Sequence, residues 1–267
     1  MTKWLLTAAA LILGLLVLSF GLGGRKQGAL AVVGSTSIQP FAEMIAQEYQ
    51  KSHPGRYVDV QGGGSTAGLQ AVANGIAEVG MCSRALKPDE TGYAAVTIAR
   101  DGLAVVVHPS NPVAGLSRTQ IRKMFAGDIT ARNWSQVGGD DRPIRIITRE
   151  EGSGTREAFQ KLVLGKARIS RKALTQESNG AVKELVRNDP GGIGYMSLGL
   201  AHGLKVLAVD GVEPSRAAVV SGQYPLVRPF LFVIRGEPSD RAKAFMAYVL
   251  SAPAQELLET EGLVRAQ

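Results

Sequence analysis

The sequence predicts an α/β protein with a mostly parallel sheet, because strand-like and helix-like segments alternate along the chain. The 267 residues, 45% of them hydrophobic and 20% charged, are sufficient for one large domain or for two lobes with separate cores. The 32 glycines suit a fold with many strand-to-helix turns and close backbone approaches.

Short apolar runs that end in turn residues indicate the strands. They lie within residues 30–38, 56–64, 77–83, 97–112, 144–149, 191–197 and 224–236.

Amphipathic spacing, such as that of Phe41 and Ile45, indicates the helices. They are expected within residues 38–55, 65–75, 117–128, 156–165 and 239–262. Ser117 is expected to cap the helix that follows it, and Ser65 or Thr66 the helix at 65–75.

The N-terminal region has the character of a targeting segment. Residues 5–22 are uncharged and almost wholly apolar, with Lys3 before them and Arg25 and Lys26 after them. We therefore predict that residues 1–28 form a signal peptide or a membrane anchor, and that the body is periplasmic or exposed at the cell surface.

Charge and cysteine content exclude several classes of function. Three of the seven net positive charges fall in the first 28 residues, which leaves +4 (7 − 3) on the body. The body contains no dense Lys/Arg block, so nucleic-acid binding is not expected. The lone Cys82 excludes an internal disulfide and a cysteine-based metal cluster, and it is expected to be a small buried hydrophobic residue. The three histidines lack metal-ligand spacing, so no metal or cofactor is expected.

Four strand-to-helix turns carry the same chemistry. They span residues 34–38, 62–68, 82–84 and 149–155, and they offer hydroxyl groups, glycines in three cases, and an arginine at position 149. One such turn alone is typical of helix capping. Four of them, together with Arg149, predict a site for a small oxyanion at the starts of the helices.

The motifs GSTSIQP, QGGGSTAGL, VGMCSRAL, REEGSGTR and GGIGYMS occur in the order found in phosphate-binding proteins of bacterial ABC transporters. The chain resembles this family from about Val32 to its C-terminus. The resemblance implies a two-lobed, periplasmic-binding-protein-like type II fold that closes on phosphate. Expected boundaries are 31–106 plus 228–267 for lobe 1, 107–227 for lobe 2, and 105–112 and 224–230 for the crossing segments.

The resemblance also implies which residues bind phosphate. They are Thr36, the backbone amide of Ser37, Ser65, Ser83, Arg149, Ser153, the backbone of Gly154, and Thr155. The secondary candidates are Ser35, Thr66, Arg84, Glu151 and Arg156. Of these, Glu151 matches an acid that holds the arginine in place in the family. Arg84 and Arg156 either line the rim of the cleft or pair with surface acids.

Ser83 departs from the family pattern, because better-known members carry an aspartate at this position. That carboxylate accepts the proton of bound phosphate and repels an unprotonated anion such as sulfate. A serine hydroxyl can accept a hydrogen bond but carries no charge. We therefore expect weaker discrimination between phosphate and sulfate.

The predicted function is capture of inorganic phosphate outside the cytoplasmic membrane by a monomer, and delivery to an ABC permease, without catalysis. A membrane-tethered sensor of phosphate, sulfate or molybdate remains an alternative. An enzyme is less favoured. Arg156 stands where a P-loop needs lysine, Gly62-x-Gly64-x-x-Ala67 matches only the looser dinucleotide fingerprint, and Ser65 lacks a recognisable catalytic base.

Overall fold

The computed structural model describes residues 28–266. The predicted signal or anchor segment lies outside the described residues, apart from Gly28. Within residues 28–266, no helix has both the length and the apolar character that crossing a membrane requires.

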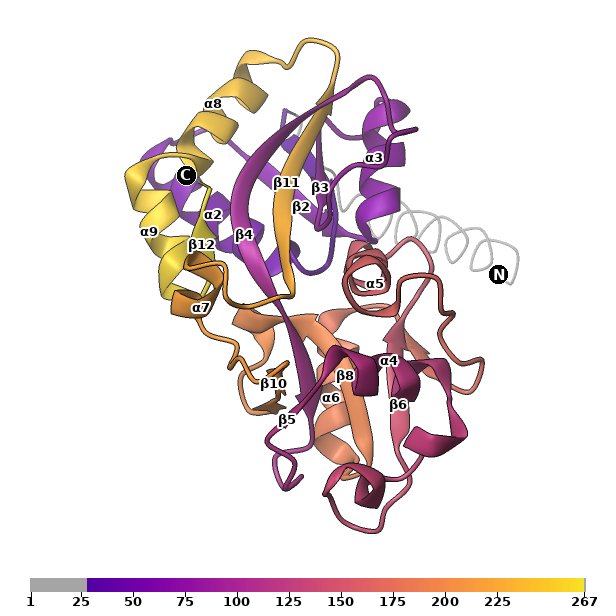
Figure 1. The fold of residues 1–267 in the computed structure, drawn as a ribbon. Helices are drawn as coiled ribbons and strands as arrows, with labels where there is room; N and C mark the ends of the chain where they lie inside the picture. The colour runs from indigo at the N-terminus through magenta and orange to yellow at the C-terminus, as the bar shows by residue number, and fades with distance from the viewer. Residues whose placement is uncertain (1–27, 267) are drawn as a thin grey trace, which may run out of the picture.

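The chain forms two α/β lobes, one above the other in Figure 1, so the predicted two-lobed fold is confirmed. The first lobe contains three parallel strands in the order β2-β1-β3 and the helices that cover them. Its elements are β1 (Leu30–Gly34), α2 (Gln39–Ser52), β2 (Val58–Gly62), α3 (Ser65–Ala73), β3 (Val79–Cys82), α8 (Asp240–Val249) and α9 (Ala252–Thr260).

The second lobe has a parallel set in the order β8-β6-β7. Its main elements are α4 (Arg118–Ala126), β6 (Arg145–Arg149), α5 (Gly154–Phe159), β7 (Leu174–Gln176), α6 (Asn179–Asn188), β8 (Gly192–Ser197) and α7 (Arg216–Val220). Short strands, three 3₁₀ helices and one π-helix complete the described fold. The strands are β5 (Gly115–Leu116), β9 (Lys205–Val206), β10 (Ala208–Val209) and β12 (Val264–Arg265); the 3₁₀ helices are η1 (Ile129–Ala131), η2 (Trp134–Val137) and η4 (Leu198–Leu200), and the π-helix is η3 (Gln160–Leu164).

Two long strands, β4 (Tyr93–Val107) and β11 (Val227–Arg235), join the lobes as an antiparallel pair (Figure 1). β11 is also antiparallel to β3, and β4 to β8. The expectation of a mostly parallel sheet is therefore wrong. The parallel order holds inside each lobe, but the crossing strands make the whole sheet mixed, which alternation of strands and helices in the sequence does not reveal.

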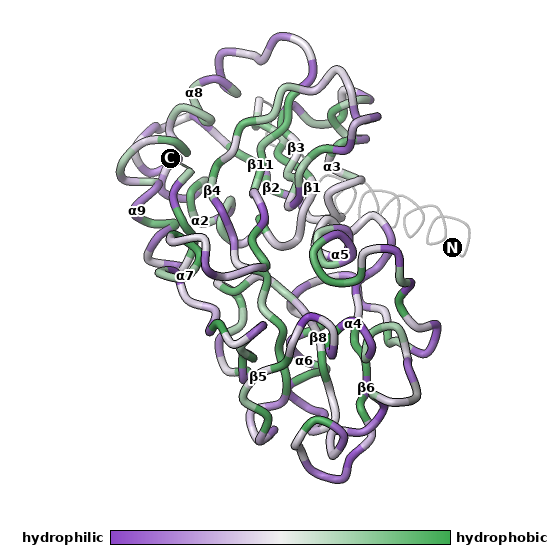
Figure 2. Tube along the Cα trace, in the orientation of Figure 1, coloured by the Kyte–Doolittle hydropathy of each residue, from purple (hydrophilic) through white to green (hydrophobic). Residues whose placement is uncertain are grey.

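Each lobe has its own hydrophobic core. β4 contributes Ile98 and Ala99 to the core of the first lobe, and Leu103 and Val105 to that of the second. In Figure 2 the hydrophobic colouring follows the strands of both lobes, and the polar colouring gathers on the outer turns. Burial of one such aliphatic side chain stabilises a core by about 1.5–3 kcal/mol. Separate cores allow the lobes to move relative to each other about the crossing strands.

Local sequence signals explain several boundaries. Ser117 caps α4 in a reciprocal capping box with Gln120, as predicted. The cap prediction for α3 is wrong. Gly64 is the N-cap, with φ of 93°, a left-handed conformation that glycine adopts readily, and Ser65 is the first helical residue. Cys82 is free and buried, as expected.

Candidate functional site

The turns that follow β1 and β6 meet between the lobes. Arg149 Nη2 donates to Thr36 Oγ1 at 3.0 Å, and the hydroxyl oxygens of Ser37 and Thr155 lie 2.7 Å apart. Both bonds join residues more than one hundred positions apart in sequence, and both connect the first lobe to the second. The sequence motifs around Thr36 and Thr155 therefore form one site.

The turns that follow β2 and β3 complete the same site. The Ser83 amide donates to Ser65 Oγ at 3.1 Å, and both serines are fully buried. They pack against the backbone of Gly154 so closely that a Cβ there would lie 2.1 Å from Ser65 Oγ and 2.8 Å from Ser83 Oγ. The Thr66 amide also donates to the Gly152 carbonyl at 3.1 Å. All four predicted turns are thus in contact, and the lobes are closed against each other.

Arg149, the last residue of β6, lies at the centre of this site with 1% of its side chain exposed. Its Nε donates to Glu150 Oε2 at 2.8 Å, and its Nη2 donates to Glu150 Oε1 at 2.9 Å. The backbone carbonyls of Gln176 and Glu177 each accept a further bond at 3.2 Å. Nη1 is buried and has no hydrogen-bond partner among the described residues. A buried guanidinium donor without a partner is energetically costly unless a ligand satisfies it.

The acid that holds Arg149 is Glu150 and not Glu151, which corrects the prediction. The Glu151 side chain is 94% exposed, and its closest ion pair is with Arg156 at 3.9 Å. Both glutamates precede Gly152, whose φ of 87° turns the chain sharply. Glu150 lies on the inner side of this turn, and Glu151 points outward.

Three side chains, Ser153 and Arg156 at the start of α5 and Ser35 in the first turn, make hydrogen bonds to nearby backbone groups. Ser153 caps α5 by accepting the Arg156 amide at 3.3 Å. The Arg156 side chain donates to the Arg149 carbonyl at 2.7 Å, so it supports the end of β6. In the first turn, the Ser37 amide donates to the hydroxyl of buried Ser35 at 3.2 Å. Ser35, Ser153 and Arg156 therefore hold the turns in shape.

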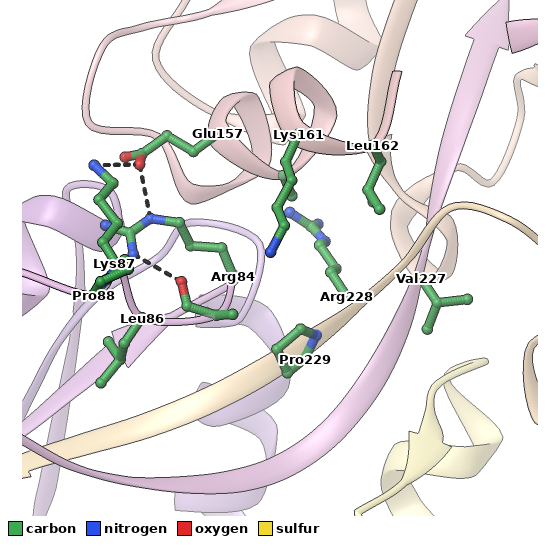
Figure 3. A pocket seen from close by; sticks show the side chains of 12 residues that line it. Arg84, Leu86, Lys87, Pro88, Glu157, Lys161, Leu162, Val227, Arg228 and Pro229 are labelled. Carbon is green, nitrogen blue, oxygen red and sulfur yellow. Dashed lines mark hydrogen bonds and ion pairs between the residues drawn. The ribbon is translucent and has the colours of Figure 1, made fainter. Parts of the chain in front are cut away.

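Arg84 pairs with acids at the edge of the cleft. It makes two bonds to Glu90 at 2.6 and 2.7 Å. Its Nε also lies 3.0 Å from Glu157 of the second lobe, which pairs with Lys87 as well (Figure 3). Burial lowers the pKa of Arg84, but the neighbouring carboxylates outweigh burial and raise it. Arg84, Lys87, Glu157 and Arg228 are among the residues that line a cavity of about 330 Å³ beside the crossing strand β11.

Three buried residues of the site, Arg228, Asp101 and Asn179, were not identified from the sequence. Arg228 Nη1 donates to Thr155 Oγ1 at 2.7 Å, and its Nε donates to Asp101 Oδ2 at 2.9 Å. The two are register partners on the crossing strands. Burial raises the pKa of Asp101 and lowers that of Arg228. Asn179 donates to Ser37 Oγ at 2.8 Å. The sequence signal available for Asp101 and Arg228 was a charged residue within a largely apolar strand pattern.

The chemistry of the assembled site suits an oxyanion. Hydroxyls, amides and the Nη1 of Arg149 converge. Arg84 Nε and Arg228 Nη2 also lack a hydrogen bond, but each lies within 3.0 Å of a carboxylate, and each nearby acid is already paired with an arginine. Neutral donors can satisfy anion oxygens without adding charge. Among residues 28–266, no group of three or more His, Cys, Asp or Glu side chains is arranged to hold a metal ion.

Comparison with known proteins gives a consistent result. A family model described as a PBP superfamily domain matches residues 23–253. The phosphate-binding protein PstS of Bacillus subtilis is 31% identical over 244 residues, which cover 89% of this chain and 80% of the relative. The PstS protein of Pseudomonas aeruginosa is 30% identical over 268 residues, covering 89% and 83%.

Comparison with solved structures gives the same result as comparison of sequences. A candidate phosphate ABC transporter substrate-binding protein from Clostridium perfringens, with bound phosphate, has a TM-score of 0.86 and 34% identity, covering 90% of this chain and 100% of its own. An ABC-type phosphate transport receptor from Vibrio cholerae has a TM-score of 0.74 and 35% identity, covering 88% and 99%. The chain therefore belongs to the PBP superfamily and, within it, to the family of phosphate-binding proteins.

Proposed function

We propose that the chain binds inorganic phosphate between its lobes, outside the cytoplasmic membrane, and delivers it to an ABC permease. The observation that carries this proposal is the unpartnered Nη1 of buried Arg149, whose Nη2 donates across the lobes to the Thr36 hydroxyl. An anion oxygen is the partner that this atom lacks. The relatives that are named as phosphate-binding proteins support the identity of the anion.

The proposed contacts are those expected from the motifs, and they come from both lobes. Thr36, Ser37, Ser65 and Ser83 supply the first-lobe groups. The second-lobe groups are Arg149, Ser153, Gly154 and Thr155. The expected boundary after residue 106 and the expected crossing segment 105–112 lie too far along the chain, because Leu103 and Val105 already belong to the second-lobe core. We therefore propose that β4 crosses between Ala99 and Leu103. The protein would act as a monomer and would catalyse no reaction.

Calorimetry of the purified protein with phosphate, arsenate, sulfate and molybdate tests the proposal. Phosphate and arsenate should bind most tightly, because their shape and protonation are alike. An absence of heat and of competition with all four anions would refute the proposed function.

The contribution of Arg149 is tested by Arg149→Met, which removes the guanidinium and keeps an apolar stem. A matched control is Arg145→Met on the same strand, because Arg145 is mostly exposed and pairs with Asp189 away from the site. Phosphate binding should be lost in the first variant and retained in the second.

A further inference from the structure

Two buried side chains outside the four turns donate to one pair of hydroxyl groups. Asn179, the first residue of α6, donates to Ser37 Oγ at 2.8 Å. Arg228 donates to Thr155 Oγ1 at 2.7 Å. The two hydroxyl oxygens are themselves 2.7 Å apart. The Ser37–Thr155 pair therefore receives one N–H from each side.

Ser197 contacts Asn179 directly and reaches Arg228 through Asp101, so it holds both donors in place. The Ser197 amide donates to Asn179 Oδ1 at 3.3 Å, and because a backbone amide can only donate, the other side-chain atom facing Ser37 must be the NH₂ group. The Ser197 hydroxyl donates to Asp101 Oδ1 at 2.8 Å, and Asp101 holds Arg228. Ser197 is fully buried, so its contacts tie Asn179 and Arg228 into a single network.

The number of hydroxyl protons on Ser37 and Thr155 limits the directions in which they can point. The Ser37–Thr155 pair has two hydroxyl protons, and the bond between the two oxygens uses one of them. Neither an NH₂ group nor a guanidinium can accept the other. The second proton must therefore point away from Asn179 and Arg228. Because Ser37 and Thr155 come from different lobes, a ligand held between the lobes can accept it.

We infer that Asn179, together with Arg228, is a positioning residue that directs a hydroxyl proton of the Ser37–Thr155 pair toward the bound anion. This inference rests on the proposed function, because it concerns the same site. Both residues act through the hydroxyls, which would otherwise be free to rotate and to present lone pairs to an anion. The network thus favours deprotonated anion oxygens at this end of the site.

A double-mutant cycle tests the inference on the full-length chain, with phosphate as the titrant. Asn179→Ala should weaken phosphate binding by about 5- to 10-fold in the wild-type background. In a Ser37→Ala background, which keeps the Ser37 backbone amide, the same change should weaken binding by less than about 2-fold. A purely structural role would give the same factor in both backgrounds.

The matched control is Ser178→Ala. Ser178 caps α6 by accepting the Ala181 amide at 3.1 Å, so this change disturbs the same helix start at the neighbouring residue. Its effect should be equal in both backgrounds. If Asn179→Ala does not fold, the uncharged and similarly sized Asn179→Leu replaces it, and the loss must again be smaller in the Ser37→Ala background.

Each result of the double-mutant cycle either supports or contradicts the positioning role of Asn179. Equal factors for the Asn179 variant in the two backgrounds, or no loss in the wild-type background, would overturn the positioning role and leave the proposed function intact. If the wild-type chain itself binds no phosphate, the proposed function is wrong, and the inference that rests on it is wrong as well.

Discussion

Gly154 provides a direct test of lobe closure, because Gly154→Ala should leave the second lobe folded but prevent the lobes from meeting. The added Cβ would lie 2.1 Å from Ser65 Oγ, whereas real Cβ contacts are essentially never shorter than 3.0 Å. Rotation of the Ser65 hydroxyl would relieve this contact but would break its bond from the Ser83 amide and would leave Ser65 Cβ at 2.9 Å. Without that rotation, the lobes must separate by 0.9 Å (3.0 − 2.1). Alanine is otherwise favourable here, since the position is helical and alanine exceeds glycine in helix propensity by about 1 kcal/mol.

The cost of this displacement follows from the bonds between the lobes. A shift of 0.9 Å is enough to break the 2.7 Å bond between Ser37 and Thr155 and the 3.0 Å bond between Arg149 and Thr36. Each bond contributes about 0.5–1.5 kcal/mol, so closure should lose about 1–3 kcal/mol, or roughly 5- to 150-fold in phosphate affinity.

Isothermal titration calorimetry measures the phosphate affinity, and thermal unfolding reports the stability of the same samples. Gly180→Ala is the matched control, because it also adds a Cβ to a glycine in a first helical turn, and its nearest neighbour would be Ser178 Oγ at an unstrained 3.7 Å. Phosphate affinity within about 2-fold of wild type in Gly154→Ala would refute the argument that this contact belongs to the bound state.

Three further predictions concern charge. Arg149→Lys loses the planar fork and should weaken phosphate binding by about 1–3 kcal/mol in calorimetry, and unchanged affinity would remove Arg149 from the site. Since Ser83 carries no charge, excess sulfate should displace phosphate measurably between pH 6 and 8 in competition binding. Ser83→Asp should reduce that displacement. If sulfate fails to compete at every pH in this range, another group discriminates between phosphate and sulfate. Burial raises the pKa of Glu90, but the hydrogen bonds from Arg84 and the Lys87 amide outweigh it and lower the pKa. A lowered pKa stabilises the fold above the ordinary value of 4.5 and loses this effect as the pH falls through the folded-state value. Glu90→Gln should therefore reduce the free energy of unfolding by about 1–2 kcal/mol at pH 7 and progressively less below pH 4.5, as measured by urea denaturation. A loss of unfolding free energy that does not change with pH would contradict this account.

The convergence of the four turns could be predicted from the sequence. Each turn combines hydroxyls with glycine or arginine after a strand, and parallel strands bring their carboxyl ends to one edge of a sheet. The two-lobed fold was implied by the resemblance of the ordered motifs to phosphate-binding proteins. That each residue binds phosphate stays a prediction.

Other parts of the site depend on three-dimensional geometry that the sequence does not encode in a short motif. Asn179 follows a loop, and only the pairing of the strands brings it to Ser37. Arg228 and Asp101 are 127 residues apart and meet because the crossing strands are antiparallel. The choice between Glu150 and Glu151 depended on how one turn bends at Gly152.

The pairing of each arginine near the site with its own acid has a consequence for unloading. Arg149 has Glu150 beside it in the same lobe, and Arg84 has Glu90. When the lobes separate, these ion pairs stay together within the first or the second lobe. The contacts that must break are those of Glu157 with Arg84 and Lys87, and bonds such as Ser37–Thr155 and Arg149–Thr36, in which at least one partner is a neutral hydroxyl. Opening the cleft therefore separates only one set of opposite charges, Glu157 from Arg84 and Lys87, so these two ion pairs account for most of the electrostatic work of opening.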